Sequence, residues 1–332
     1  MRTVFLKFVG ILVIGLFVVS SPAYAEKLRV ALVVKSLGNG FFEAARDGAV
    51  EAAEELGIEI IYTGPTQATA EGQIEIINSL IAQKVDAIAI SANDPNALIP
   101  ITKKAMQRGI KVISWDSGIA PEGRMLDLIP ADVGGIGKIQ IQMINDTLKG
   151  QGEIAILSAT AQATNQNLWI AAMKEELKNS EFSGLKLVSV VYGDDKSDKS
   201  YREALGLFKT YPDLKGIIAP TTVGILASAK AVKDNDLIGK IYVSGLGLPS
   251  EMAAYVMDGA VDTFAIWNPI DLGYSAAYLC DSLIKGTAKG EEGESIPAGR
   301  MGEIKVGKDG VSVMGLPFVY NKSNVEKFAE IF

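Results

Sequence analysis

A carboxylate, an amide and an indole follow two short apolar runs in the segment Ala87–Gly118. The runs are rich in β-branched residues, and the apolar residues between them recur at helical spacing, which predicts a strand, a helix and a second, parallel strand. Asn93 follows the first predicted strand, and Trp115 and Asp116 end the second. Ligands of open α/β sheets bind at this edge. An acceptor carboxylate beside an aromatic face suits a ligand with hydroxyl groups and one apolar face, so these residues predict binding rather than catalysis.

The same kinds of side chain follow most of the other strands that the sequence predicts. Sugar hydroxyls both donate and accept hydrogen bonds, and each charge-assisted bond from a hydroxyl to a carboxylate contributes roughly 1.5–3 kcal/mol. Aromatic rings cover the C–H faces of a sugar ring. The candidate ligand-binding residues, all placed at predicted strand ends, are therefore Lys35, Asn39, Phe41, Phe42, Asn93, Asp116, Asn165, Gln166, Pro220, Thr221, Thr222, Gly247, Trp267 and Asn268.

Each of these residues also has a purely structural interpretation. An isolated Asn or Thr at a strand end commonly caps a helix or forms a turn. Asp94 followed by proline has the pattern of a helix start, one of Phe41 and Phe42 is expected in the core, and Trp115 can serve packing alone. The prediction of a binding site therefore depends on the gathering of these residues at one edge and not on any single residue.

Three further segments carry motifs that we set aside. Residues 245–250 (GLGLPS) follow a predicted strand but have too few glycines for a dinucleotide fingerprint. The charged segments 193–199 (GDDKSDK) and 291–294 are interpreted as solvated loops. On this interpretation the second half of the chain gives the site amides and hydroxyls but no carboxylate.

Composition excludes several classes of function. The 332-residue chain has no histidine and a single cysteine, Cys280, so the usual zinc and copper sites, the Ser-His and Cys-His pairs and an intrachain disulfide are absent. The net charge of −7 does not attract nucleic acid. We therefore expect no catalytic residues, no metal, no cofactor and no nucleic-acid partner.

The first 25 residues have the pattern of a secretory signal peptide. Arg2 and Lys7 precede an apolar run, and Ala23-Tyr24-Ala25 fits the small-x-small cleavage rule. A single membrane anchor is the alternative, which the short apolar run disfavours. We expect cleavage after Ala25 and, because no cysteine follows for lipid attachment, a protein free in the periplasm.

Strand and helix patterns alternate from Leu28 to Lys285, which predicts an α/β fold with parallel sheets covered by helices on both faces. The pattern occurs twice, so we expect two Rossmann-like lobes joined by a three-segment hinge, with crossings near 129–133 and 268–271 and in the tail. The N-terminal lobe is assigned 26–130 plus about 269–300. The C-terminal lobe is assigned 131–268 plus about 301–332.

Several long segments resemble the type I periplasmic sugar-binding proteins that serve ABC transporters. KSLGNGFF, SANDPNAL and SWDSG match the binding loops of that family, and the resemblance covers the whole chain after the signal peptide. The segments YTGPTQATAEGQIEIINSLIAQKVDAIAISANDP, ATNQNLW, YPDLKGIIAPTTVG and SGLGLPSEM are most similar to the rhamnose-binding proteins and their relatives, the autoinducer-2 receptors.

The resemblance implies ligand-binding roles for individual positions. It supplies Lys35, Asp116, Gln166 and Pro220 from the autoinducer-2 receptor pattern. Asn165 stands where those receptors have an aspartate, and Thr222 where they have an alanine. Together with the missing carboxylate of the second lobe, these departures favour a neutral 6-deoxyhexose.

The sequence therefore predicts a monomeric, hinge-closing receptor that captures a small sugar, rhamnose in the first place, and delivers it to an ABC-transporter permease in the inner membrane. A receptor for autoinducer-2, or for another pentose or deoxyhexose, is the alternative within the family. Outside it, the rivals are an exported sugar-modifying enzyme that uses Asp116 and Asp94 as an acid–base pair and a sugar-responsive repressor.

Overall fold

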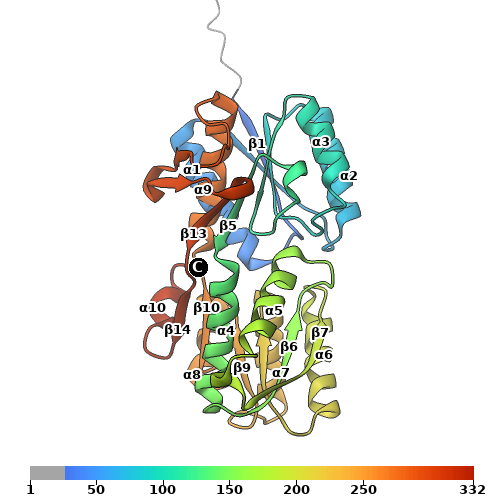
Figure 1. The fold of residues 1–332 in the computed structure, drawn as a ribbon, viewed down its shortest axis with the longest axis vertical. Helices are drawn as coiled ribbons and strands as arrows, with labels where there is room; N and C mark the ends of the chain where they lie inside the picture. The colour runs from blue at the N-terminus through green and yellow to red at the C-terminus, as the bar shows by residue number, and fades with distance from the viewer. Residues whose placement is uncertain (1–26) are drawn as a thin grey trace, which may run out of the picture.

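Two parallel sheets, one above the other along the long axis, form the framework of the protein (Figure 1). This computed structural model describes residues 27–332, so the predicted signal peptide and its cleavage site lie outside the described residues. Helices cover both faces of the sheets, and the alternating order of strands and helices is the one that the periodicity predicts. The α/β prediction is therefore confirmed.

The first sheet has the strand order β13-β5-β4-β3-β1-β2, and all its pairings are parallel. Its strands are short and mostly buried, as expected for a sheet covered on both faces. They span β1 (Arg29–Val33), β2 (Glu59–Thr63), β3 (Ala87–Ile90), β4 (Lys111–Trp115), β5 (Leu126–Ala131) and β13 (Val311–Gly315).

The second sheet has the parallel order β7-β6-β8-β9, and an antiparallel pair, β10-β14, follows next to it through bridges from Leu246 to Ala265 and from Val243 to Val261. A small hairpin, β11-β12, lies outside both sheets. These strands span β6 (Gly152–Ser158), β7 (Leu185–Tyr192), β8 (Leu214–Ala219), β9 (Tyr242–Gly245), β10 (Thr263–Ile266), β11 (Ser295–Pro297), β12 (Glu303–Lys305) and β14 (Phe318–Asn321).

Most helices follow the carboxyl ends of parallel strands and so present their first turns to the space between the sheets. They span α1 (Gly40–Leu56), α2 (Ala70–Gln83), α3 (Ile99–Gln107), α4 (Val133–Leu148), α5 (Thr164–Glu176), α6 (Ser197–Thr210), α7 (Thr222–Asp234), α8 (Pro249–Asp258), α9 (Pro269–Lys285) and α10 (Val325–Ala329). Several begin a few residues before the apolar periodicity, because their first turns carry polar residues.

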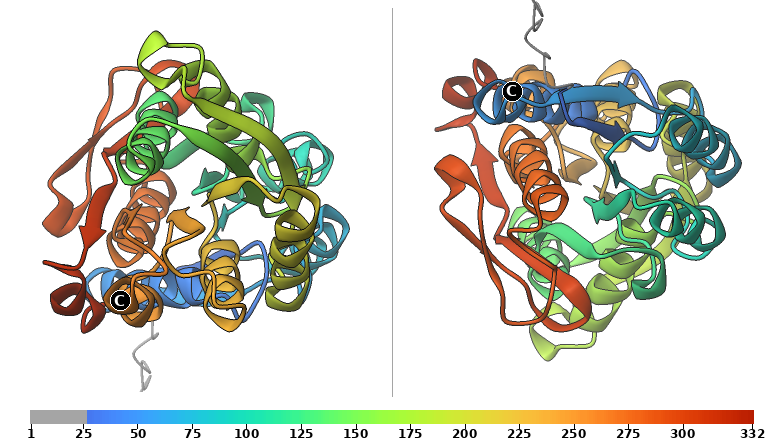
Figure 2. Two further views of the ribbon diagram at one scale, coloured as in Figure 1. Left: turned by 90° about the horizontal axis from the view of Figure 1, so that it is seen from below. Right: turned by 90° about the horizontal axis from the view of Figure 1, so that it is seen from above.

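The chain passes between the two sheets three times. The crossings follow β5, β10 and β13, and the first two lie at the predicted places. The expected assignment of 301–332 to the C-terminal lobe is wrong for its first part, because β13 pairs with β5 in the first sheet through Val311 and Asp127. The third crossing therefore lies between Gly315 and Phe318, and both end views show the C-terminal segment along one side of the molecule (Figure 2).

Helices α1 and α9 pack against each other at backbone contact. A Cβ built on Gly48 would lie 1.8 Å from the carbonyl oxygen of Ile270, and one on Gly273 would lie 1.8 Å from the carbonyl oxygen of Ala45. Only glycine permits this approach. The close packing of α1 against α9 fixes the position of α1, and so of its N-terminal end, where Asn39 caps the helix and Phe41 and Phe42 are buried.

Candidate ligand-binding site

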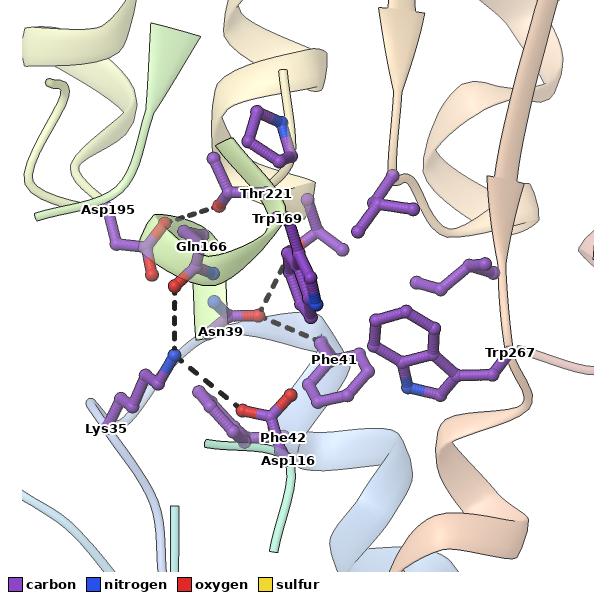
Figure 3. Close-up of a pocket in the computed structure, with 14 residues that line it drawn as sticks. Lys35, Asn39, Phe41, Phe42, Asp116, Gln166, Trp169, Asp195, Thr221 and Trp267 are labelled. Carbon is purple, nitrogen blue, oxygen red and sulfur yellow. Dashed lines mark hydrogen bonds and ion pairs between the residues drawn. The ribbon is translucent and has the colours of Figure 1, made fainter. Parts of the chain in front are cut away.

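A cavity lies between the lobes, where the carboxyl ends of the strands face each other. Most of the candidate residues line it, together with four that sequence reasoning missed (Figure 3). The lining residues are Lys35, Asn39, Phe41, Phe42, Asp116, Gln166, Trp169, Asp195, Pro220, Thr221, Thr222, Leu246, Ile266 and Trp267.

Lys35 connects the two lobes at the centre of the polar side of the cavity. Its Nζ donates hydrogen bonds to Asn165 Oδ1 at 2.7 Å and to Gln166 Oε1 at 3.2 Å, both on α5 of the second lobe. The same Nζ lies 3.7 Å from Asp116 Oδ2. Burial lowers the pKa of Lys35, and the carboxylates of Asp116 and Asp195 oppose this shift. The ammonium group is thus held by partners from both halves.

Asp116 follows β4 in a left-handed backbone conformation (φ 60°), in which its carboxylate faces the cavity. Ser91 Oγ donates to Oδ2 at 2.7 Å, and Asn165 Nδ2 donates to Oδ1 at 3.2 Å. Burial raises the pKa of this carboxyl, and Lys35, Ser91 and Asn165 counteract the shift. The hydrogen bonds from Ser91 and Asn165 thus fix the orientation of the Asp116 carboxylate in the cavity.

Two buried amides hold the loop that carries Lys35. Asn93 Nδ2 donates to the carbonyl oxygens of Lys35 at 2.9 Å and Thr69 at 3.2 Å. Gln73 Nε2 donates to the carbonyl oxygens of Val34 and Ser91, and its Oε1 accepts from the amide of Asn93. Asn93 therefore acts on the site by positioning and does not line the cavity.

The second lobe supplies a carboxylate, which corrects our interpretation of segment 193–199 as a solvated loop. Asp195 follows β7, has φ 51°, and lines the cavity. Its Oδ1 accepts a hydrogen bond from Thr221 Oγ1. Burial raises the pKa of Asp195, and Thr221 and Lys35 counteract the shift. The inference of a second lobe without a carboxylate is therefore wrong.

Aromatic rings form the opposite, apolar side of the cavity. The Trp267 ring lies 6.1 Å from Phe41 and 5.6 Å from Trp169, centroid to centroid, in edge-to-face arrangements. Phe42 lines the cavity and packs against Trp115, which is fully buried behind it. Trp115 thus has the packing role that we gave as its structural interpretation, and both Phe41 and Phe42 reach the cavity.

Four of the predicted site residues lie away from the cavity wall. Asn93 and Asn165 contact residues on the wall, as described above. Gly247 is packed against Met252, which a Cβ would approach to 2.7 Å. Asn268 caps α9 and bonds Asp271 on the hinge side. Asp94, which has the sequence pattern of a helix start, accepts from two backbone amides of the turn before α3 and does not line the cavity.

The residues that sequence reasoning missed are Trp169, Asp195, Leu246 and Ile266. Asp195 had the same signal as the others, since it follows a predicted strand. Ile266 and Leu246 are apolar residues at the ends of strands, and that pattern is typical of core residues. Trp169 lies one helical turn after Asn165 on α5, so the helix that supplies the polar residues also brings this indole into the cavity.

Neither a membrane span nor a metal centre is formed by the part of the chain that the structure describes. No helix in residues 27–332 has both the length and the apolar character needed to cross a membrane. The same residues contain no group of three or more His, Cys, Asp or Glu side chains placed to hold a metal ion.

A two-lobed fold with a ligand cavity at the hinge is the arrangement of a binding receptor, and the model of the periplasmic binding protein domain matches residues 30–288. The chain therefore belongs to the periplasmic binding proteins, the solute-binding receptors of ABC transporters. The relatives that it matches are sugar-binding transport receptors, so it is a binding protein and not an enzyme, which removes the exported enzyme from the alternatives.

Among solved structures, the chain is similar to an ABC transporter solute-binding protein from Clostridium phytofermentas with bound L-rhamnose, at 38% identity and a TM-score of 0.89, covering 93% of this chain and 100% of that one. It is also similar to a sugar ABC transporter protein from Actinomyces odontolyticus, at 39% identity and a TM-score of 0.73, covering 92% and 99%. The D-ribose/D-allose-binding protein of Pseudomonas aeruginosa is 29% identical over 244 residues, which are 71% of this chain and 76% of that protein.

Proposed function

We propose that this protein is a periplasmic receptor that captures a single neutral sugar, L-rhamnose in the first place, and delivers it to the permease of an ABC transporter. The observation that carries the proposal is the cavity between the lobes and the kinds of side chain that line it. Carboxylates, amides, hydroxyls and an ammonium group line one side of it, and indole and phenyl rings line the other (Figure 3). The similarity to the rhamnose-bound protein of Clostridium phytofermentas supports the choice of sugar.

The division of the cavity into two sides supports a deoxy sugar independently of any missing charge. Trp267 lies across the cavity from the ammonium group of Lys35 (Figure 3), and the apolar side chains of Ile266 and Leu246 also line the cavity. A methyl group in place of a hydroxymethyl group gains burial there and leaves no hydroxyl without a partner. The 6-methyl group of rhamnose meets this requirement, while the ring hydroxyls face the polar side.

The residues would divide the work of binding as follows. Asp116 accepts from ring hydroxyls, and Lys35 and Gln166 bond a ring or hydroxyl oxygen. The rings of Phe42 and Trp267 cover the faces of the sugar. The remaining predicted residues form part of the cavity wall, make a contact between the lobes or donate a supporting hydrogen bond. These residues are Asn39, Phe41, Asn93, Asn165, Pro220, Thr221 and Thr222. We assign no ligand contact to Gly247 or Asn268.

Ligand-driven closure follows from the way the cavity is divided between the lobes. Hydrogen bonds cross the cleft from Lys35 to α5 and from Thr222 Oγ1 to Asn39 Oδ1. A sugar that contacts both lobes binds the closed form more tightly than the open form and shifts the population toward it. The closed form would then be the one that docks on the permease.

The test is a thermal-shift and calorimetry screen of the purified protein after signal removal, with rhamnose, fucose, ribose, xylose, galactose and autoinducer-2. Binding stabilises the native state by about 2.7 kcal/mol at a hundredfold excess over Kd. We expect the largest shift with rhamnose. A shift with another sugar alone would overturn the assignment of rhamnose, a shift with autoinducer-2 alone would favour the signalling receptor, and no shift with any sugar would overturn the proposed function.

A further inference from the structure

The cavity holds two carboxylates from different lobes and one ammonium group between them. Asp116 belongs to the first lobe and Asp195 to the second, and Lys35 interacts with both charges. No other charged side chain lines the cavity within the described residues. With all three groups ionised, the cavity carries one excess negative charge.

We propose, on the basis of the proposed function, that Asp195 determines specificity at this site by accepting a ligand hydroxyl and by excluding sugars that carry a carboxylate or a phosphate. The Thr221 hydroxyl donates to Asp195 Oδ1, and this contact leaves Oδ2 to accept from a ligand. The carboxylate projects into the cavity from the side opposite Asp116 (Figure 3). A neutral sugar can donate to both carboxylates, whereas an anionic group placed between them meets two like charges in a medium that screens poorly.

The backbone supports a functional role for this residue. Asp195 has φ 51°, a left-handed conformation that an L-residue seldom adopts, and aspartate tolerates it better than most. Its neighbour Asp194 has φ 54°, but its side chain pairs with Lys199 at 2.6 Å and is 44% exposed. Two adjacent aspartates therefore share a conformation and differ in direction, since one faces the cavity and the other faces solvent.

This pair provides a matched experiment. Asp195→Asn and Asp194→Asn change the protein's net charge equally and keep the shape of the side chain, but only the first alters the cavity. We expect Asp195→Asn to weaken rhamnose binding by about 5- to 30-fold, the loss of charge assistance in one well-oriented hydrogen bond, and Asp194→Asn to leave Kd unchanged. Kd is measured by calorimetry, with circular dichroism as the check on folding.

The second measurement is discrimination between neutral and anionic sugars, with L-rhamnose and L-rhamnose 1-phosphate as a pair that differs only in a phosphate at C1, among the oxygens that face the polar side. We expect the wild type to bind the phosphate at least tenfold more weakly than rhamnose, and Asp195→Asn to narrow this ratio of Kd values. Wild-type binding of the phosphate as tight as that of rhamnose, or a ratio that Asp195→Asn leaves unchanged, would overturn the proposal.

A third variant separates a direct contact from a supporting role. Thr221→Val removes the hydrogen bond to Asp195 and leaves the carboxylate in place. If Asp195 acts on the ligand itself, Asp195→Asn costs several times more affinity than Thr221→Val, and equal losses would overturn the direct contact. If the wild type binds no sugar in the screen above, the proposed function fails, whereas sugar binding that is insensitive to Asp195→Asn overturns only this inference.

Discussion

Replacement of Asp116 by asparagine tests the polar side of the cavity most directly. The amide keeps the shape of the carboxylate and the acceptor for Ser91 Oγ, which now lies at 2.7 Å from Oδ2, but it removes the charge that faces Lys35 at 3.7 Å. A hydrogen bond to a charged acceptor contributes about 1.5–3 kcal/mol and a neutral one about 0.5–1.5 kcal/mol. Each sugar hydroxyl bonded to Asp116 therefore loses about 1–2 kcal/mol.

A carboxylate that accepts from two adjacent hydroxyls would lose about 2–4 kcal/mol of binding free energy, which corresponds to a Kd about 30- to 1,000-fold higher. The assay is calorimetric titration with the sugar that gives the largest thermal shift on the wild type. Asp94→Asn is the control, because Asp94 caps a turn outside the cavity and asparagine caps equally well. A folded Asp116→Asn variant with Kd within about threefold of the wild type would refute the placement of the pocket.

Three other measurements test the structure. Burial raises the pKa of Asp195 in the folded protein. The ionised Asp195 carboxylate therefore destabilises the folded state. This destabilisation is absent below about pH 4, grows until the pH reaches the raised pKa and stays constant above it. The Tm advantage of unliganded Asp195→Asn over the wild type should accordingly be larger at about pH 7 than at about pH 4, and the reverse order would contradict the assigned direction. Gly48→Ala should lose about 2 kcal/mol or more in urea unfolding because its Cβ would overlap α9, whereas Gly206→Ala in open space should gain about 0.5–1 kcal/mol. Saturating sugar should change the intrinsic fluorescence, with a smaller change in Trp267→Phe, since Trp169 and Trp267 line the cavity; an unchanged wild-type spectrum would contradict their contact with ligand.

Local periodicity was sufficient to predict the strands and helices from Leu28 to Lys285, because each buried parallel strand is a short apolar run and each covering helix has an apolar face. The rule that strand carboxyl ends carry the ligand then placed Lys35, Asp116 and Gln166 together although they are far apart in the chain. The strand β13 escaped this reasoning. Its partner β5 lies nearly two hundred residues away, and nothing within Val311–Gly315 indicates which of two sheets it joins.

Asp195 shows where an argument from composition fails. Segment 193–199 is rich in charged residues, and such segments are usually solvated. Its composition therefore predicts an exposed loop and gives no sign that Asp195 faces the cavity. The direction of that side chain depends on the left-handed backbone and on Thr221, which follows a different strand. Position at a strand end was the better guide than the character of the segment.

The contacts of Lys35 show which interactions would oppose and which would favour closure in the proposed function. Its hydrogen bonds to Asn165 and Gln166 join the lobes and favour closure, but they are made at the cost of removing an ammonium group from water, the largest influence on its lowered pKa. The carboxylates of Asp116 and Asp195 also lose hydration on burial, which raises the pKa of both groups. Closure without a ligand therefore gains hydrogen bonds and loses hydration of three charged groups. In the proposed function, a sugar whose hydroxyls donate to both carboxylates, while its apolar face contacts the rings, would stabilise the closed form, and selectivity and closure would then depend on the same three charges.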